Sequence, residues 1–152
     1  PPKSVWSHVF RPRTMLYTVL WAGIGVGLVV ALFLRTNLDL TISPVRNPTF
    51  VTLSDGSIRN AYELRIRNMH HDERSFTLGL RADGSLAMTL EGREGLTVSV
   101  PADELRIQRL YLTAAPGSAL ASGGRAAVEI WATDAEGRAR TQVTTHFHGS
   151  AP

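Results

Sequence analysis

The residues with the clearest capacity for chemistry in this 152-residue chain are histidines, and they form two groups. His146 and His148 lie two positions apart in an alternating segment, so both side chains project from one face of a predicted strand. The second group is Met69, His70 and His71, which follow one another in a predicted loop. Because imidazole and thioether ligands together suit copper, each group is a candidate copper site.

The remaining patterns do not converge on a catalytic set. The chain has no cysteine, which excludes disulfides, thiolate zinc sites and iron–sulfur clusters held by this chain. The acidic pairs 72–73 and 103–104 lie in predicted loops, where solvated charges are the expected state. The glycines of 23–27 lie in an apolar run, follow no strand and do not match a dinucleotide-binding loop. We therefore expect a non-enzymatic chain without a cofactor of its own.

These residues are expected to be held at a membrane by the stretch Thr14–Leu34. It contains no charge, arginines close it on both sides, and it lacks the polar stripe of a helix in a soluble domain. As a helix rising about 1.5 Å per residue it covers roughly 30 Å, the thickness of a bilayer core. A cleaved signal peptide is the alternative, but its apolar region usually spans about 7–15 residues and ends in small residues. The sequence therefore predicts a transmembrane helix over 14–34.

Charge around this stretch predicts its orientation. Residues 1–46 carry five basic side chains against one acidic side chain, and three of the basic ones lie in the segment 1–13. The positive-inside bias then places 1–13 in the cytoplasm as a juxtamembrane segment, with Trp6 and Phe10 at headgroup level. The remainder would lie in the periplasm, anchored in the inner membrane. Because the chain begins without methionine, we expect further sequence upstream.

Composition also bears on partners. Gly23, Gly27 and Ala31 recur every fourth residue on one helix face, which favours packing against another helix, either an upstream transmembrane helix of the same protein or a helix of a partner. The alternative is that glycine is simply common in membrane helices. Residues 47–152 carry 11 basic and 12 acidic side chains, so a nucleic-acid-binding face is not expected.

Alternation of apolar and polar residues dominates the chain after Arg35. Strands are predicted at 38–44, 49–53, 62–67, 76–80, 86–91, 96–100, 107–114, 126–133 and 139–148. Turn residues separate them, no helical period follows residue 35, and the small-residue run 114–124 is expected to be a flexible loop. This pattern indicates an all-β fold over residues 36–150, an immunoglobulin-like antiparallel β-sandwich preceded by a single transmembrane helix.

The two histidine groups are expected at opposite ends of such a sandwich. One follows an early strand and the other ends the last strand, and a strand of about ten residues spans roughly 33 Å. The groups therefore cannot form one site, and neither has supporting residues nearby in sequence. We expect exposed polar histidines rather than a metal site.

The run from Asn47 to Tyr62, NPTFVTLSDGSIRNAY, resembles the start of the C-terminal domain of FixG/CcoG-type proteins, the polyferredoxin-type accessory proteins of cytochrome c oxidase. The segment 11–17 is similar to that family too, and the resemblance covers essentially residues 8–148. The family-like positions are Asn47, Pro48, Asp55, Gly56, Arg59, Asn60 and Tyr62.

The resemblance implies a larger membrane protein with two four-iron four-sulfur clusters in an upstream cytoplasmic region. It also implies a role in copper reduction and delivery during assembly of cbb-type cytochrome oxidase. Because this chain has no cysteine, no cluster-binding residue of the family falls on any position here. The architecture is what the resemblance carries over: a final transmembrane helix and then an immunoglobulin-like domain.

The same run has a local physical reading. The pairs 47–48 and 55–56 are turn formers, and Phe50, Val51 and Leu53 are candidates for the core between them. The segment could serve folding alone or the docking of a partner, and folding is favoured.

Three functions are compatible with these features. The leading one is a membrane-anchored, non-catalytic interaction or positioning domain that contacts oxidase subunits or copper carriers. The alternatives are a periplasmic copper-binding domain that uses the histidine and methionine groups, and a stand-alone single-pass accessory protein.

Overall fold

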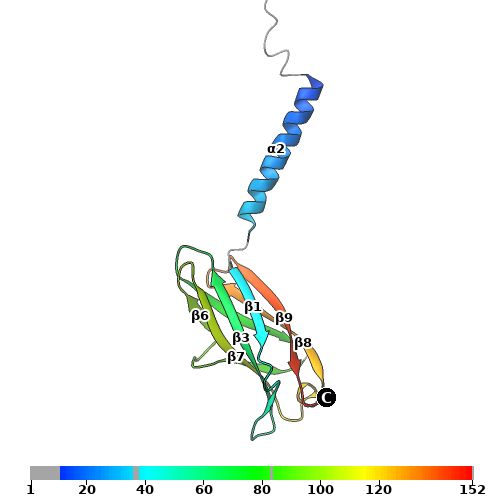
Figure 1. Cartoon of the computed structure of the whole chain (residues 1–152), viewed down its shortest axis with the longest axis vertical. Helices are drawn as coiled ribbons and strands as arrows, with labels where there is room; N and C mark the ends of the chain where they lie inside the picture. The colour runs from blue at the N-terminus through cyan, green and yellow to red at the C-terminus, as the bar shows by residue number, and fades with distance from the viewer. Residues whose placement is uncertain (1–10, 36–37, 83, 152) are drawn as a thin grey trace, which may run out of the picture. The chain divides into compact units, whose positions relative to one another are not determined.

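The computed structural model describes residues 11–35, 38–82 and 84–151, and the chain divides after Arg35 into a helical unit and a sandwich unit (Figure 1). The helical unit is α2, Pro12–Phe33, which starts two residues before the predicted stretch and ends one residue earlier. Proline fits its first turn, where a missing N–H costs no hydrogen bond. Among the described residues, α2 is the one helix long and apolar enough to cross a membrane.

No residue of α2 is buried in the part of the chain that the structure describes. Gly23, Gly27 and Ala31 are all exposed, and a Cβ added at either glycine would meet no atom within 4 Å. Packing of this face against other helices therefore stays a prediction. Residues 1–10 of the predicted juxtamembrane segment, with Trp6 and Phe10, lie outside the described residues.

The sandwich unit consists of two antiparallel sheets, as predicted (Figure 1). The first sheet has the strand order β1-β3-β7-β5, with β2 paired to β3, and the second has the order β6-β4-β8-β9. The strands are β1 Leu38–Pro44, β2 Val51–Thr52, β3 Ile58–Asn68, β4 Arg74–Ala82, β5 Leu86–Leu90, β6 Thr97–Val100, β7 Leu105–Ala114, β8 Arg125–Asp134 and β9 Arg140–His148.

Period-two alternation explains how these strands share one core. Along β3 every second side chain is buried, and the same holds along most of β8. The fully buried side chains of Leu64, Phe76, Leu110, Ile130 and Phe147 come from both sheets and fill the space between them. Every buried apolar side chain among the described residues belongs to the sandwich, so this unit has a core of its own.

Asn68 links the two sheets by hydrogen bonds at one end of the sandwich. It is the last residue of β3, is fully buried, and donates from its amide to the carbonyls of Asp72, Val100 and Pro101 at 2.9, 3.2 and 3.1 Å. Because Val100 ends β6, an edge strand of the second sheet, this side chain ties the two sheets together. Its Oδ1 accepts a hydrogen bond from the N–H of His70 at 3.0 Å, so both ends of the amide are satisfied.

The prediction of a flexible loop over residues 114–124 is wrong in part. Residues Ala119–Ser122 form a single helical turn, α3, in which Leu120 and Ala121 are buried. The Ser118 hydroxyl accepts a hydrogen bond from the N–H of Ala121 at 3.2 Å, and the N–H of Ser150 donates to the Ala121 carbonyl at 2.8 Å. One turn is too short to show a helical period, and its order comes from the cap and from tertiary contacts.

Val51 corrects a second expectation. It was expected in the core, but 45% of it is exposed, and β2 is shorter than the predicted 49–53 strand. Val51 pairs with Arg59 of β3, whose side chain lies on the outer face of the first sheet. Residues directly opposite each other in a sheet share a face, so Val51 lies outside as well.

Trp131 lies on the outer face of the second sheet, directly opposite Gly79 of β4 in the register. A Cβ at Gly79 would coincide with the indole ring, so the ring packs across the bare backbone. The Arg140 guanidinium lies 4.8 Å from the centroid of the same ring. Glycine is therefore required at position 79 by space rather than by backbone conformation.

We expect Gly79→Ala to destabilise the sandwich by about 1–3 kcal/mol, since the added methyl must displace the indole ring. Urea denaturation measures the free energy of unfolding. Gly124→Ala is the matched control, because a Cβ there meets no atom within 4 Å and the variant should unfold like the parent. The double variant Gly79→Ala/Trp131→Ala should lose less than the sum of the single changes. Additive losses would show that the ring is not the obstacle.

Candidate functional site

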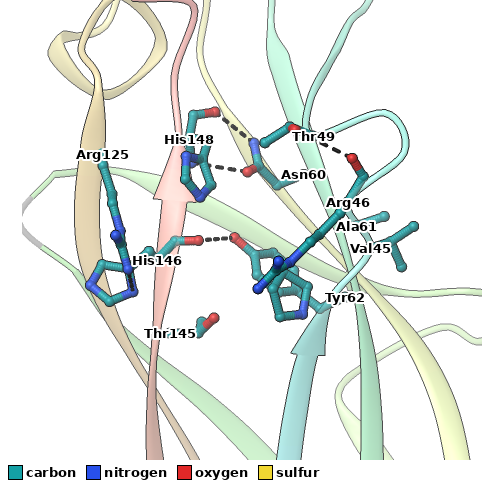
Figure 2. Close-up of a pocket in the computed structure, with 11 residues that line it drawn as sticks. Val45, Arg46, Thr49, Asn60, Ala61, Tyr62, Arg125, Thr145, His146 and His148 are labelled. Atoms are coloured by element: carbon teal, nitrogen blue, oxygen red, sulfur yellow. Dashed lines mark hydrogen bonds between the residues drawn. The ribbon is translucent and has the colours of Figure 1, made fainter. Parts of the chain in front are cut away.

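A polar cavity of the sandwich lies beside the end of β9, between this strand and the loop that follows β1 (Figure 2). Its volume is about 430 Å³, within the range of roughly 300–1,000 Å³ that is usual for ligand pockets. We call it the β9 hollow. It is lined by Pro44, Val45, Arg46, Thr49, Asn60, Ala61, Tyr62, Arg125, Thr145, His146 and His148.

Asn60 connects β3 to β9 across the floor of the hollow. Its Nδ2 donates to the His148 carbonyl at 2.8 Å, and its Oδ1 accepts from the His148 N–H at 2.9 Å (Figure 2). A side-chain amide carries the same donor and acceptor as a peptide group. Asn60 therefore takes the place of a neighbouring strand along the outer edge of β9.

Tyr62 makes the second connection. Its hydroxyl donates to the His146 carbonyl at 2.7 Å, and only 1% of the residue is exposed (Figure 2). Burial raises the pKa of the Tyr62 phenol above its ordinary value, because the charged form would lose its hydration. The phenol thus stays protonated and keeps its role as a donor.

The two histidines predicted as candidate ligands project outward, while their neighbours Thr145 and Phe147 are buried. The His146 Nδ1 lies 3.0 Å from Nη2 of Arg125 (Figure 2). A guanidinium has only donors, so Nδ1 is the acceptor in this pair and the ring proton lies on Nε2. With Nδ1 engaged in this way, Nε2 is the remaining ring nitrogen and carries a donor.

Arg46 completes the lining from the opposite side. Its side chain extends from the loop after β1 towards β9 (Figure 2), and the Thr49 hydroxyl donates to its carbonyl at 3.4 Å. The Asn47–Pro48 peptide bond of this loop is cis. The hollow thus combines two arginines and two histidines with hydroxyl groups, and no carboxylate lines it. This arrangement can bind an acceptor but offers no nucleophile with a paired base.

The other candidate group, Met69, His70 and His71, follows the opposite end of β3. Asn60 lies near the start of β3 and Asn68 ends it, so the strand separates the two histidine groups, as the sandwich topology predicts. His71 Nδ1 lies 3.1 Å from a carboxylate oxygen of Asp103. Across residues 11–35, 38–82 and 84–151, no three His, Cys, Asp or Glu side chains are placed to hold one metal ion.

The remaining family-like positions, Asp55, Gly56 and Arg59, make local contacts outside the lining of the hollow. Gly56 has a φ of +85° in the turn before β3, a conformation that favours glycine. The Asp55 carboxylate accepts from the N–H of Ser57 at 2.9 Å, and hydrogen bonds from Ser57 lower the pKa of this carboxyl. The Arg59 guanidinium lies 5.2 Å from the centroid of the Tyr111 ring. These contacts give the run 47–62 a structural role.

Sequence reasoning missed Arg46 and Arg125. The hairpin of β8 and β9 could have revealed Arg125, because the turn at 134–137 sets the register that places it opposite His148. Arg46 had no comparable signal, since its position depends on the path of a loop.

Comparison with known proteins gives a consistent result. Residues 28–150 match the family described as "IG-like fold at C-terminal of FixG", whose description names FixG as a candidate oxidoreductase. Protein RdxA of Cereibacter sphaeroides is 51% identical over 152 residues, which are 98% of this chain and 32% of the relative. Protein RdxB of the same organism is 44% identical over 148 residues, 97% of this chain and 31% of the relative. The chain thus spans about a third of the length of these relatives.

One solved structure shows the same fold. A FixG-related protein from Vibrio parahaemolyticus superimposes with a TM-score of 0.63 at 17% identity. The match covers 77% of this chain and all of that chain.

We expect Tyr62→Phe to destabilise the sandwich by about 1–3 kcal/mol near neutral pH, since the buried His146 carbonyl loses its donor. Tyr111→Phe is the control, because the Tyr111 hydroxyl bonds an exposed carboxylate of Glu91. The free energy of unfolding from urea titrations gives both values.

The pH dependence of the same pair of proteins tests the raised pKa. A phenol whose pKa is raised by folding stabilises the folded state fully below the unfolded pKa of about 10, and this contribution falls as pH rises further. The difference between parent and Tyr62→Phe should therefore narrow above about pH 10. A difference that stays constant through this range would contradict a buried, protonated phenol.

Proposed function

Because the chain belongs to the FixG C-terminal family of immunoglobulin-like domains, we propose that it is a non-catalytic interaction or positioning module of a longer membrane protein. The observation that carries this proposal is the join between α2 and β1. An apolar helix long enough to cross a membrane is followed within a few residues by a sandwich with its own core. Such a join supports a role in holding a binding domain at a membrane surface.

The state of the polar groups in the β9 hollow supports a role without catalysis. The Asn60 amide and the Tyr62 hydroxyl are already hydrogen-bonded to the backbone of β9. A catalytic base or nucleophile needs a partner within hydrogen-bond reach in a productive arrangement. The hollow offers donors and hydroxyls instead, which suit recognition.

The longer protein is the unit in which this module would act. The relatives are about three times as long as the matched region. We place the redox chemistry of the full protein, with its four-iron four-sulfur clusters, in the part upstream of this chain. We further propose that the full protein serves the assembly of cbb-type cytochrome oxidase and the handling of copper, with oxidase subunits or copper carriers as partners.

The charges flanking α2 support a location of the sandwich in the periplasm. Arg11 and Arg13 precede the apolar segment together with Lys3, whereas Arg35 and Arg46 follow it with Asp39 between them. The excess of basic residues on the N-terminal side favours the cytoplasm for that side. The anchor would then lie in the inner membrane, with Gly23 and Gly27 facing other helices of the same protein.

Fusions that report on compartment test this orientation. Alkaline phosphatase joined through a linker after Ala151 should be active, and green fluorescent protein at the same place should be dark. The same two reporters placed ahead of α2 should give the reverse pattern and serve as the control. Active phosphatase ahead of the helix and inactive phosphatase after it would refute a periplasmic sandwich.

Removal of the sandwich tests the function itself. In cells whose full-length protein lacks residues 38–151 but keeps α2, we expect the truncated protein in the membrane and at least a severalfold loss of cbb-type oxidase activity. The variant Gly124→Ala, in the intact protein, controls for manipulation of the gene. Normal oxidase activity with the truncated protein present would show that the sandwich is not needed for assembly.

A further inference from the structure

We propose that the β9 hollow binds carboxylate groups from an acidic segment of a partner protein. The proposal rests on the function as an interaction module and specifies the chemistry that this module recognises. It is carried by the lining of the hollow, which contains Arg46, Arg125, His146 and His148 but no acidic side chain.

The positive character of the hollow is local. Residues 47–152 carry 11 basic and 12 acidic side chains, so the sandwich as a whole is not basic. Four arginines elsewhere in the sandwich have acidic partners within 4.0 Å, namely Arg65, Arg74, Arg109 and Arg138. Arg46 and Arg125 have no such partner among the described residues, which is also true of Arg59, Arg67, Arg81, Arg93, Arg106 and Arg140. What distinguishes Arg46 and Arg125 is that both line one cavity that no carboxylate lines. Two cations without counter-charges at one cavity favour an anionic ligand.

The hydrogen-bonding groups of the hollow point to an acceptor as the ligand. Arg125 donates to His146, which orients its guanidinium and leaves further N–H groups of the fork for a ligand. The His146 ring carries its proton on Nε2 and is a donor as well. A carboxylate, which accepts through both oxygens and pairs with arginine in a bidentate manner, matches this set.

Side chains already bond the backbone edge of β9 where it borders the hollow, which disfavours strand addition there. An unpaired strand edge can accept a peptide as an extra strand. Here the His148 N–H and carbonyl are bonded to Asn60, and the His146 carbonyl is bonded to Tyr62. Recognition through side chains is therefore favoured, which leaves the arginines and histidines as the recognising groups.

Charge complementarity and size favour an acidic protein segment as the source of the anion. Arg46 comes from the loop after β1 and Arg125 from β8, and no carboxylate lines the cavity between them. A cavity of about 430 Å³ has room for one or two acidic side chains of a bound segment.

Fluorescence anisotropy on the full chain in neutral detergent tests the proposal. The probe is a fluorescein-labelled, glutamate-rich peptide, and the comparison peptide has glutamine at every glutamate position. We expect binding of the first peptide only. Arg46→Gln and Arg125→Gln should each weaken this binding about tenfold, which corresponds to a charged hydrogen bond of about 1.4 kcal/mol. Both side chains are exposed, so thermal unfolding of the variants should match that of the parent.

Arg93→Gln is the matched control, because it removes the same charge from an exposed turn away from the hollow. It should leave the affinity for the glutamate-rich peptide unchanged.

Competition by free glutarate would support carboxylate recognition with a small molecule as a second source of the anion. Absence of competition would support a requirement for the peptide. Equal binding of both peptides, no binding of either, or an equal loss with Arg93→Gln would overturn the proposal. Oxidase activity and compartment reporters test the proposed function separately, so the two can fail independently.

Discussion

Buried hydrogen-bonding groups on one strand hold the two sheets of this sandwich together. β3 points Asn60, Tyr62 and Asn68 into the space between the sheets, where an unpaired polar group is costly. All three donate to backbone carbonyls of the second sheet or of the loops beside it, Asn60 and Tyr62 to β9 and Asn68 at the end of β6. Since β6 and β9 are the two edges of that sheet, one strand of the first sheet fastens both edges of the second. The chain achieves this without a disulfide.

The hydrogen bonds from β3 to β9 give the histidines of β9 a structural role. His146 and His148 drew attention as metal ligands, yet it is their backbone groups that Asn60 and Tyr62 bind. The family-like run and the last strand were unrelated in the sequence, and the fold joins them at one cavity. The rings of the histidines remain available on the outer side, next to Arg125. The backbone atoms of His146 and His148 thus hold the two sheets together, while their ring atoms are left for ligand recognition.

The parts of the structure that depend on local pattern could be predicted, and those that depend on tertiary contacts could not. The uncharged run of α2 and the alternation in strands such as β3 are properties of short segments, so helix and sandwich followed from them. The turn α3 is ordered by a cap on Ser118 and by a bond from Ser150, which lies far along the chain. Val51 is exposed because of its register with Arg59, and Arg46 reaches the hollow because of a loop path.

The ladder between β1 and β3 has a mechanical consequence. β1 receives the chain from α2 and runs beside β3 over seven register pairs before it ends at the hollow. A pull on Leu38 along the axis of β1 would act parallel to both strands of this ladder. Hydrogen bonds across an antiparallel pair lie perpendicular to the strands, so such tension loads all of them together in shear instead of opening them one after another. The ladder therefore resists a pull along β1 more strongly than a pull across it.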